Sequence, residues 1–142
     1  YAIESTPYPL IRDRLFIIDL RKGLDRWVDI GFAATTCFDI LEHIEPKHLD
    51  KVISEICRVT HQTVFIRMPM ADREVPDPYK HGPAEHCSMF TRKEWIEMFE
   101  KHGFGEKPVD DVLFRVQMVD PNNQVYVPFH TFDTLKLMRK SL

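Results

Sequence analysis

The sequence reads Ala-Ala-Thr-Thr-Cys-Phe-Asp-Ile-Leu-Glu-His-Ile at residues 33–44, and this stretch decides the fold expected for the chain. The small and apolar residues 33–37 predict a buried strand. Acidic and imidazole side chains follow at once, at Asp39, Glu42 and His43. Ligands of open α/β sheets bind beyond the carboxyl ends of the strands. The polar residues after this strand therefore predict a binding site.

Regular patterns continue after this stretch. Apolar residues recur at three- and four-residue steps over residues 46–60, which predicts a helix with Pro46 in its first turn. Residues 63–68 form a nearly continuous apolar run that predicts a strand, and Pro69 limits its length.

A second helix signal lies at residues 91–94, Thr-Arg-Lys-Glu, which have the spacing of a capping box. Phe90 and Trp95 are placed to form a hydrophobic staple around it, and Gly103 is expected to end the helix.

The ends of the chain are harder to interpret. Residues 15–20 are apolar and predict a strand that delivers Asp19 to its carboxyl end. Residues 112–119 and 124–129, with a turn between them, predict an antiparallel hairpin. Residues 135–142 form a basic tail that is either a short terminal helix or frayed.

Together the elements predict an α/β fold in one domain over residues 1–142. The sheet is expected to be doubly wound and mostly parallel, with a C-terminal antiparallel hairpin.

Composition narrows the class of protein. The chain has 142 residues, of which 44% are hydrophobic and 29% charged, and a net charge of −3. It has no long basic run, so a dedicated polyanion binder is disfavoured and nucleic acid is expected only as a locally bound substrate. No apolar stretch is long enough to span a membrane, and the three cysteines are odd in number and widely spaced. We therefore expect a cytoplasmic protein with reduced thiols and no membrane association.

The order of these elements resembles that of class I S-adenosylmethionine-dependent methyltransferases. Residues 32–60, with residues 36–44 as their core, resemble the family's fourth strand and the helix that follows it. Residues 64–70 resemble the fifth strand. Residues 86–104, ending Glu-Lys-His-Gly-Phe, resemble the next helix and its exit. The resemblance implies a Rossmann-like fold, S-adenosylmethionine as cofactor, and methyl transfer to an oxygen or nitrogen acceptor of unknown identity, which is a small molecule or derives from nucleic acid.

Cofactor-binding positions carry over by this resemblance. Asp19, followed by Leu20, occupies the place of the acid that binds the adenine amino group, and an ionised carboxylate can accept a hydrogen bond from that amine. The alternative is that Asp19 caps the next turn. Cys37, Phe38 and Asp39 occupy positions that line the methionine moiety.

Catalytic candidates follow from the chemistry. Methyl transfer from a sulfonium is an in-line displacement, which needs mainly correct positioning and needs a base only if the acceptor must lose a proton. His43 is the best candidate base, because imidazole titrates near neutral pH, and His86 is the second. Equally, His43 could simply donate to a backbone carbonyl and fix the turn. We expect a helical turn to place Asp39, Glu42 and His43 on one face.

A metal site is a less favoured alternative. Asp39, Glu42, His43 and His86 are similar to the acid-x-x-Glu-His and distal His pattern with which small-RNA 2′-O-methyltransferases and some quinone-pathway O-methyltransferases hold a divalent metal. The metal would lower the pKa of an acceptor hydroxyl. The pattern has glutamate where this chain has Asp39, whose side chain is shorter by one methylene.

The loop over residues 71–89 is either an acceptor-side lid or a solvated connector. Its cationic and hydroxylated residues, with Arg67 before it, are candidates to grip the acceptor; they are Arg73, Tyr79, Lys80 and His81. Large aromatic residues at helical spacing are expected in the core rather than the site, together with Cys57; they are Trp27, Trp95, Phe99 and Phe104.

Part of the family's cofactor site has no counterpart in this sequence. The five glycines, at 23, 31, 82, 103 and 105, form no Gly-x-Gly-x-Gly loop. The acid that ends the second strand is also missing, so the chain resembles the carboxyl-terminal two-thirds of a methyltransferase.

The family's sheet order is 3-2-1-4-5-7-6. Strands two and one, which are missing here, would therefore lie between the third strand, residues 15–20, and the fourth. Either that strand moves beside the fourth, or two chains complete each other's sheets, or the chain is part of a longer protein. The rival to an enzyme is a non-catalytic, truncated domain that acts in oligomerisation or partner binding.

Overall fold

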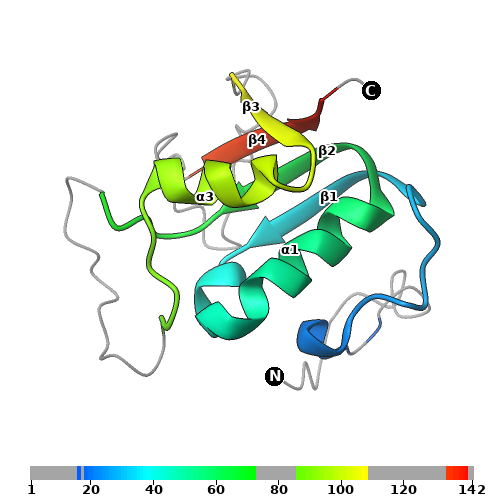
Figure 1. Cartoon of the computed structure of the whole chain (residues 1–142), viewed down its shortest axis with the longest axis horizontal. Coiled ribbons are helices and arrows are strands. Elements are labelled where there is room, and N and C mark those ends of the chain that lie inside the picture. The colour runs from blue at the N-terminus through cyan, green and yellow to red at the C-terminus, as the bar shows by residue number, and fades with distance from the viewer. Residues whose placement is uncertain (1–15, 17, 73–85, 109–133, 141–142) are drawn as a thin grey trace, which may run out of the picture.

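Four strands form a single sheet in the computed structural model, which describes residues 16, 18–72, 86–108 and 134–140 (Figure 1). Along the sheet their order is β1-β2-β4-β3. β1 and β2 pair in parallel, whereas β4 is antiparallel to both β2 and β3. The expected α/β fold is confirmed, with a partly parallel open sheet. The strands are β1 (Phe32–Phe38), β2 (Thr60–Arg67), β3 (Phe104–Lys107) and β4 (Thr134–Arg139).

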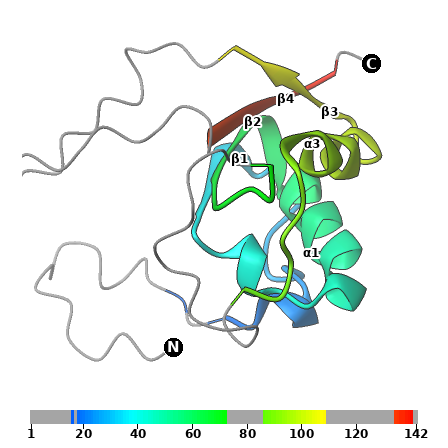
Figure 2. The ribbon, with the colours of Figure 1, turned by 90° about the vertical axis from the view of Figure 1, so that its left-hand side faces the viewer.

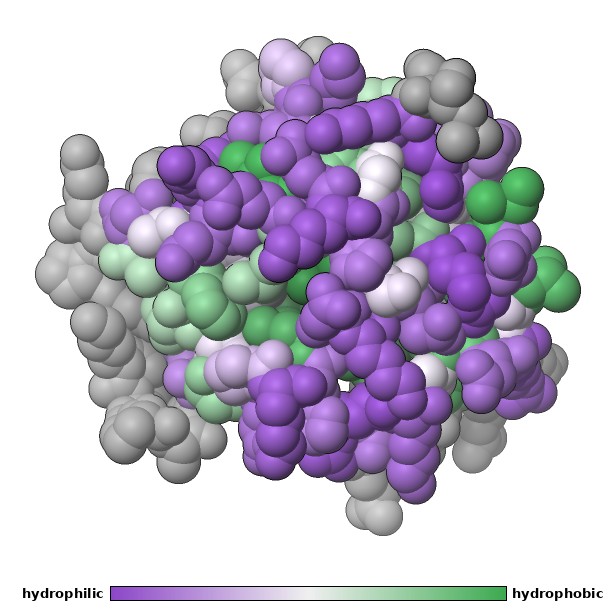
Figure 3. All heavy atoms as spheres, viewed as in Figure 1, coloured by the Kyte–Doolittle hydropathy of each residue, from purple (hydrophilic) through white to green (hydrophobic). Residues whose placement is uncertain are grey.

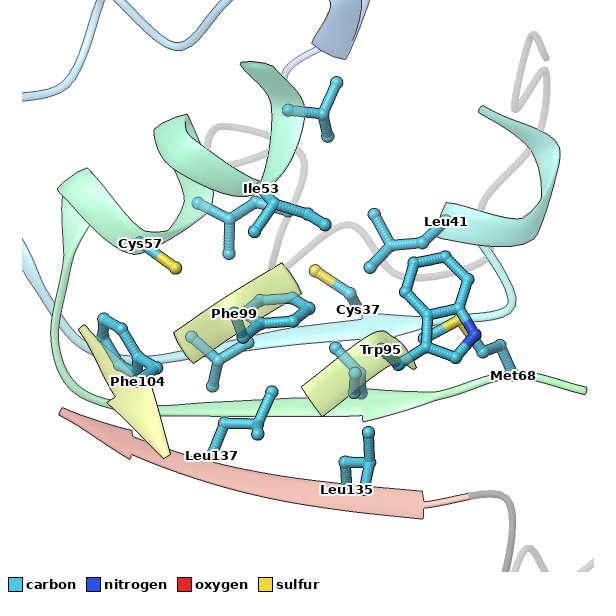
Figure 4. Packing of buried hydrophobic residues seen from close by; sticks show 14 of the residues in the cluster. Cys37, Leu41, Ile53, Cys57, Met68, Trp95, Phe99, Phe104, Leu135 and Leu137 are labelled. Atoms are coloured by element: carbon cyan, nitrogen blue, oxygen red, sulfur yellow. The ribbon is translucent and has the colours of Figure 1, made fainter. Parts of the chain in front are cut away.

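Two helices, α1 (Pro46–Val59) and α3 (Arg92–Glu100), pack on the same face of this sheet (Figure 2). The core fills the layer between them and the strands (Figure 4). Trp95, Phe99 and Phe104 are completely buried there, as expected for large aromatic side chains. Because burial of such side chains is the main driving force for folding, this layer fixes where β1 ends and the next turn begins.

Both helices begin as the sequence predicts. Pro46 lies in the first turn of α1. At α3 the Thr91 hydroxyl accepts from the backbone N–H of Glu94, whose carboxylate accepts from the backbone N–H of Thr91, so the capping box is complete. The rings of Phe90 and Trp95 lie 5.3 Å apart between centroids, in edge-to-face contact. After α3, Gly103 adopts a φ of 82°, a left-handed conformation that suits glycine.

The strand predicted at residues 15–20 is wrong for the part of it that the structure describes. Phe16, Ile18 and Asp19 have no regular structure, and Leu20 starts the 3₁₀ turn η2 (Leu20–Lys22). Phe16 and Ile18 are about 40% exposed, so they lack the burial that favours a strand. The alternative interpretation of Asp19 holds, because its carboxylate accepts from the backbone N–H of Arg21 and caps the turn.

The basic tail also differs from its prediction. Residues 134–139 form β4 rather than a helix or a frayed end. Leu135 and Leu137 alternate toward the core and are completely buried, whereas Lys136 between them is less so. This period of two is a strand signal that the charged residues obscured. The hairpin predicted at 112–119 and 124–129 lies outside the described residues.

Seen from the helical side, the surface is largely hydrophilic, with apolar patches at the margin where the segment before β1 runs (Figure 3).

Trp27 lies in that segment, outside the core. Its ring is in edge-to-face contact with the ring of Phe16, with 5.7 Å between the two centroids, so the prediction that Trp27 belongs to the core is wrong. No helix in the described part of the chain has the length and apolar character to cross a membrane.

Candidate functional site

The candidate site begins where β1 ends. Asp39 follows β1 with a φ of 52°, a left-handed conformation that aspartate tolerates better than most residues. Its backbone N–H donates to the carbonyl oxygen of Arg67 at 2.8 Å, and its carboxylate forms an ion pair with the Arg67 guanidinium. Because β1 and β2 are parallel, Phe38 is the register partner of Arg67, and the two strands end side by side. This contact fixes the direction in which the chain leaves the sheet.

The side chains of the next turn, η3 (Leu41–His43), differ in how deeply they are buried. Leu41 and Glu42 are both 1% exposed, and Leu41 packs in the core beside Trp95 (Figure 4). His43 remains 37% exposed. The single face expected for Asp39, Glu42 and His43 does not form, although the side chains of Glu42 and His43 still approach each other. The turn is of 3₁₀ type and follows a left-handed residue, so the spacing of an α-helix does not apply.

A second segment, residues 86–88, is attached to this turn. The Ser88 backbone N–H donates to the Glu42 carbonyl oxygen at 3.0 Å, and the Ser88 hydroxyl donates to the Ile44 carbonyl oxygen at 2.5 Å. The Cys87 thiol lies 3.6 Å from the same Glu42 oxygen. These bonds hold His86 against His43, with ring centroids 5.0 Å apart. The sequence analysis missed this role of Ser88 and Cys87, because it depends on residues far apart in the chain.

Three of the predicted residues come together here. Ligand atoms of Glu42, His43 and His86 all lie within 4.8 Å of one another. The His43 Nε2 is 3.9 Å from the Glu42 Oε1. Asp39, the fourth member of the predicted metal set, does not belong to this group. Its carboxylate is engaged by Arg67, so the structure brings together three of the four predicted ligands.

Glu42 has an unusual environment for a glutamate. Neither carboxylate oxygen has a hydrogen-bond partner among the described residues, although both are buried. Burial raises the pKa of Glu42 to about 7, with a smaller opposing effect from His43, because the charged form has lost its hydration. The carboxyl group is thus positioned to accept a hydrogen bond, a proton or a cation.

The predicted cofactor residues are dispersed. Asp19 binds the Arg21 guanidinium with two contacts of 2.9 Å, which lowers the pKa of Asp19 to about 2. Leu20 packs against the edge of the core. Cys37 points into the core, where burial raises the pKa of its thiol to about 12. Phe38 is 41% exposed, with the Arg67 guanidinium 5.8 Å from its ring centroid.

Most of the predicted lid cannot be placed. Residues 73–85 lie outside the described residues, and with them Arg73, Tyr79, Lys80 and His81. At the ends of this segment, the Ala71 backbone N–H donates to the Phe90 carbonyl oxygen at 2.9 Å.

Comparisons with known proteins identify the fold. No protein-family model and no curated protein match the sequence. A solved structure of magnesium protoporphyrin IX methyltransferase from Synechocystis PCC 6803, with bound SAH, is similar with a TM-score of 0.54 and 11% identity, over 87% of this chain and 49% of that one. A chain of the complex between the Haloferax volcanii Trm112 methyltransferase activator and a putative methyltransferase is similar with a TM-score of 0.50 and 14% identity, over 80% of this chain and 56% of that one.

The sheet agrees with these similarities. The order β1-β2-β4-β3 agrees with positions 4-5-7-6 of the family's sheet. The chain spans about half the length of the two similar chains. It has the class I methyltransferase fold.

Proposed function

We propose that this chain supplies the methionine-side and acceptor-side half of an S-adenosylmethionine-dependent methyltransferase site. The observation that carries the proposal is the combination of the fold with a polar cluster, Glu42, His43 and His86, at the carboxyl end of β1. In open α/β sheets this is the edge where ligands bind.

The described residues fit one part of the cofactor. The exposed Phe38 ring and the left-handed turn at Asp39 offer a surface and backbone groups to the methionine end. Asp19 has its carboxylate bound to Arg21, and the sequence contains no glycine-rich loop, so the ribose and adenine contacts must come from elsewhere. β1 has a described neighbour on one side only, and we propose that the rest of a methyltransferase sheet joins it at its other edge.

The chain's own residues would then orient the acceptor and receive its proton. When bound, the cofactor would supply a methyl group on a positively charged sulfur for in-line transfer to the acceptor oxygen or nitrogen. His43, exposed on one side and 3.9 Å from the Glu42 carboxylate on the other, takes the acceptor's proton, with Glu42 stabilising the resulting imidazolium. His86 lies close enough to share this role.

The test is a titration of the chain with S-adenosylhomocysteine, followed by nuclear magnetic resonance of the backbone amides. Half a site should bind in the millimolar range, about −4 kcal/mol, because part of the contacts is missing. We expect the shifts to concentrate at residues 37–43 and 86–88. His102→Ala, which removes an imidazole that contacts Asp50 on α1, should leave them unchanged. No shifts, or shifts spread over the α1 and α3 surface, would contradict the proposal.

A second candidate function is oligomerisation through the free edge of β1 without catalysis. Apolar side chains are exposed on and before this strand: Val28 is 74% exposed, Ile30 56% and Phe32 41%. An edge strand of this kind favours association. Sedimentation of the chain distinguishes the two candidates: a stable dimer that does not respond to S-adenosylhomocysteine would favour this one, and replacing Val28 and Ile30 by lysine should then give a monomer.

A further inference from the structure

We propose that Glu42, His43 and His86 bind one divalent transition-metal ion, and that Asp39 takes no part. The role of the ion in methyl transfer rests on the proposed function, whereas binding of the ion can be tested by itself. The three side chains offer one carboxylate oxygen and two imidazole nitrogens, all within 4.8 Å of one another. Zinc ligands at about 2.1 Å from the ion lie roughly 3.4 Å apart, so small side-chain rotations would complete the group.

The buried carboxylate is the strongest indication of a ligand. Both Glu42 oxygens are buried and have no hydrogen-bond partner among the described residues. A buried polar group without a partner costs about 1–3 kcal/mol, and a charged one costs more. The side chain is also fixed, because its neighbour Leu41 is packed in the core. A cation between Glu42 and the imidazoles would satisfy the carboxylate without any change in the backbone.

Backbone contacts hold the two halves of the group together before any ion binds. Ser88 donates through its backbone N–H to Glu42 and through its hydroxyl to Ile44. These bonds attach the segment that carries His86 to the turn that carries the other two ligands. Such prior attachment reduces the entropy lost on binding, which favours a tight site.

Asp39 is excluded by its own contacts. Its carboxylate forms an ion pair with Arg67, and its backbone N–H donates to the Arg67 carbonyl oxygen at 2.8 Å. To join the metal it would have to leave the arginine and turn away from the end of β2. The remaining set has two nitrogens and one carboxylate. Such a set suits Zn²⁺ or Co²⁺, whereas Mg²⁺ prefers oxygen ligands only.

The consequence for chemistry is local. Three protein ligands leave a coordination position open at the carboxyl end of β1, beside the surface proposed for the methyl acceptor. An ion there would lower the pKa of an acceptor hydroxyl and so favour transfer to oxygen. The ion would then replace His43 as the group that promotes loss of the acceptor's proton, because a ring nitrogen that ligates a metal cannot also accept that proton.

The experiment uses the whole chain after removal of metals. Co²⁺ is added and its visible absorption is followed, and Zn²⁺ affinity is measured by competition. We expect one ion per chain, with Mg²⁺ in excess unable to displace it. His86→Ala and Glu42→Met should each weaken Co²⁺ binding by at least about 100-fold, because loss of a group that only orients a ligand already costs about 10- to 100-fold. Asp39→Asn, the matched control, should change affinity by less than about threefold.

The outcomes are distinct. Equal binding in His86→Ala and the wild type would overturn the site. A loss in Asp39→Asn as large as in His86→Ala would overturn the three-residue set in favour of four ligands. Thermal unfolding of each metal-free variant shows that it is folded, so that lost binding is not lost structure. A chain that binds S-adenosylhomocysteine but no Co²⁺ would remove this inference and leave the proposed function intact.

Discussion

Glu42 and Glu55 are the same residue type in two regions of the molecule, and their environments are opposite. Glu55, on α1, accepts from Arg58 at 2.8 and 2.9 Å and from the Leu24 backbone N–H at 2.8 Å. These contacts, the Arg58 side chain first, lower its pKa to about 2, whereas burial without partners raises the pKa of Glu42 to about 7. Glu55 holds two segments of the structure together, whereas the Glu42 carboxyl is buried without a hydrogen-bond partner among the described residues. The difference lies in their partners and not in their chemistry.

The Glu55 region depends on one cation. Arg58 contacts Glu55, the Asp29 carboxylate at 2.6 Å, and the carbonyl oxygens of Trp27 and Leu24 at 2.9 and 3.1 Å. It thereby fastens the segment before β1 to the end of α1.

The largest expected effect is from Arg58→Ala. It should lower the free energy of unfolding by about 3 kcal/mol, because several partly buried groups lose their partner together. Urea unfolding measures the loss. Lys47→Ala, which removes the exposed ion pair with Glu45, should cost less than about 0.5 kcal/mol. Losses of equal size would show that the network adds no more than a surface ion pair.

A matched pair of substitutions tests directly whether Glu42 and Glu55 contribute to stability in opposite ways. In metal-free protein, Glu55→Met should lower the free energy of unfolding by about 2 kcal/mol, because it leaves Arg58 and the Leu24 N–H short of a partner. Glu42→Met should raise it by about 1 kcal/mol, because an apolar side chain replaces a buried carboxyl without partners. Urea unfolding of the two variants measures the direction of each change in the free energy of unfolding. A loss at Glu42→Met would mean that its carboxyl is satisfied in the folded protein.

The smallest expected effect is in acid. Since the pKa of Glu55 is about 2 when folded and lies near 4.5 when unfolded, its contribution is complete above the unfolded value and is lost as the pH falls from about 4.5 toward 2. Between about pH 5 and pH 3 this should cost the wild type about 1 kcal/mol more than Glu55→Gln. Urea unfolding at a series of pH values measures the difference. Parallel curves for the two proteins would contradict the assignment.

Local patterns predicted some of the fold well. The start of α1 at Pro46, the capping box at Thr91 and the strands β1 and β2 follow from neighbouring residues, so the sequence was sufficient. The strand expected at residues 15–20 and the helix or frayed end expected at 135–142 were wrong. In both places the outcome depended on whether a distant strand was there to pair with: β4 has β2 and β3, and Leu20 has no described partner strand.

The candidate site divides in the same way. The sequence determined which chemical groups follow β1, since a motif records residue types and their spacing. Only the tertiary structure decided that Asp39 pairs with Arg67, that Glu42 points inward, and that Ser88 brings His86 across to His43. The physical reason is that burial and pairing depend on which segments meet in the folded sheet, and spacing along the chain does not record those encounters.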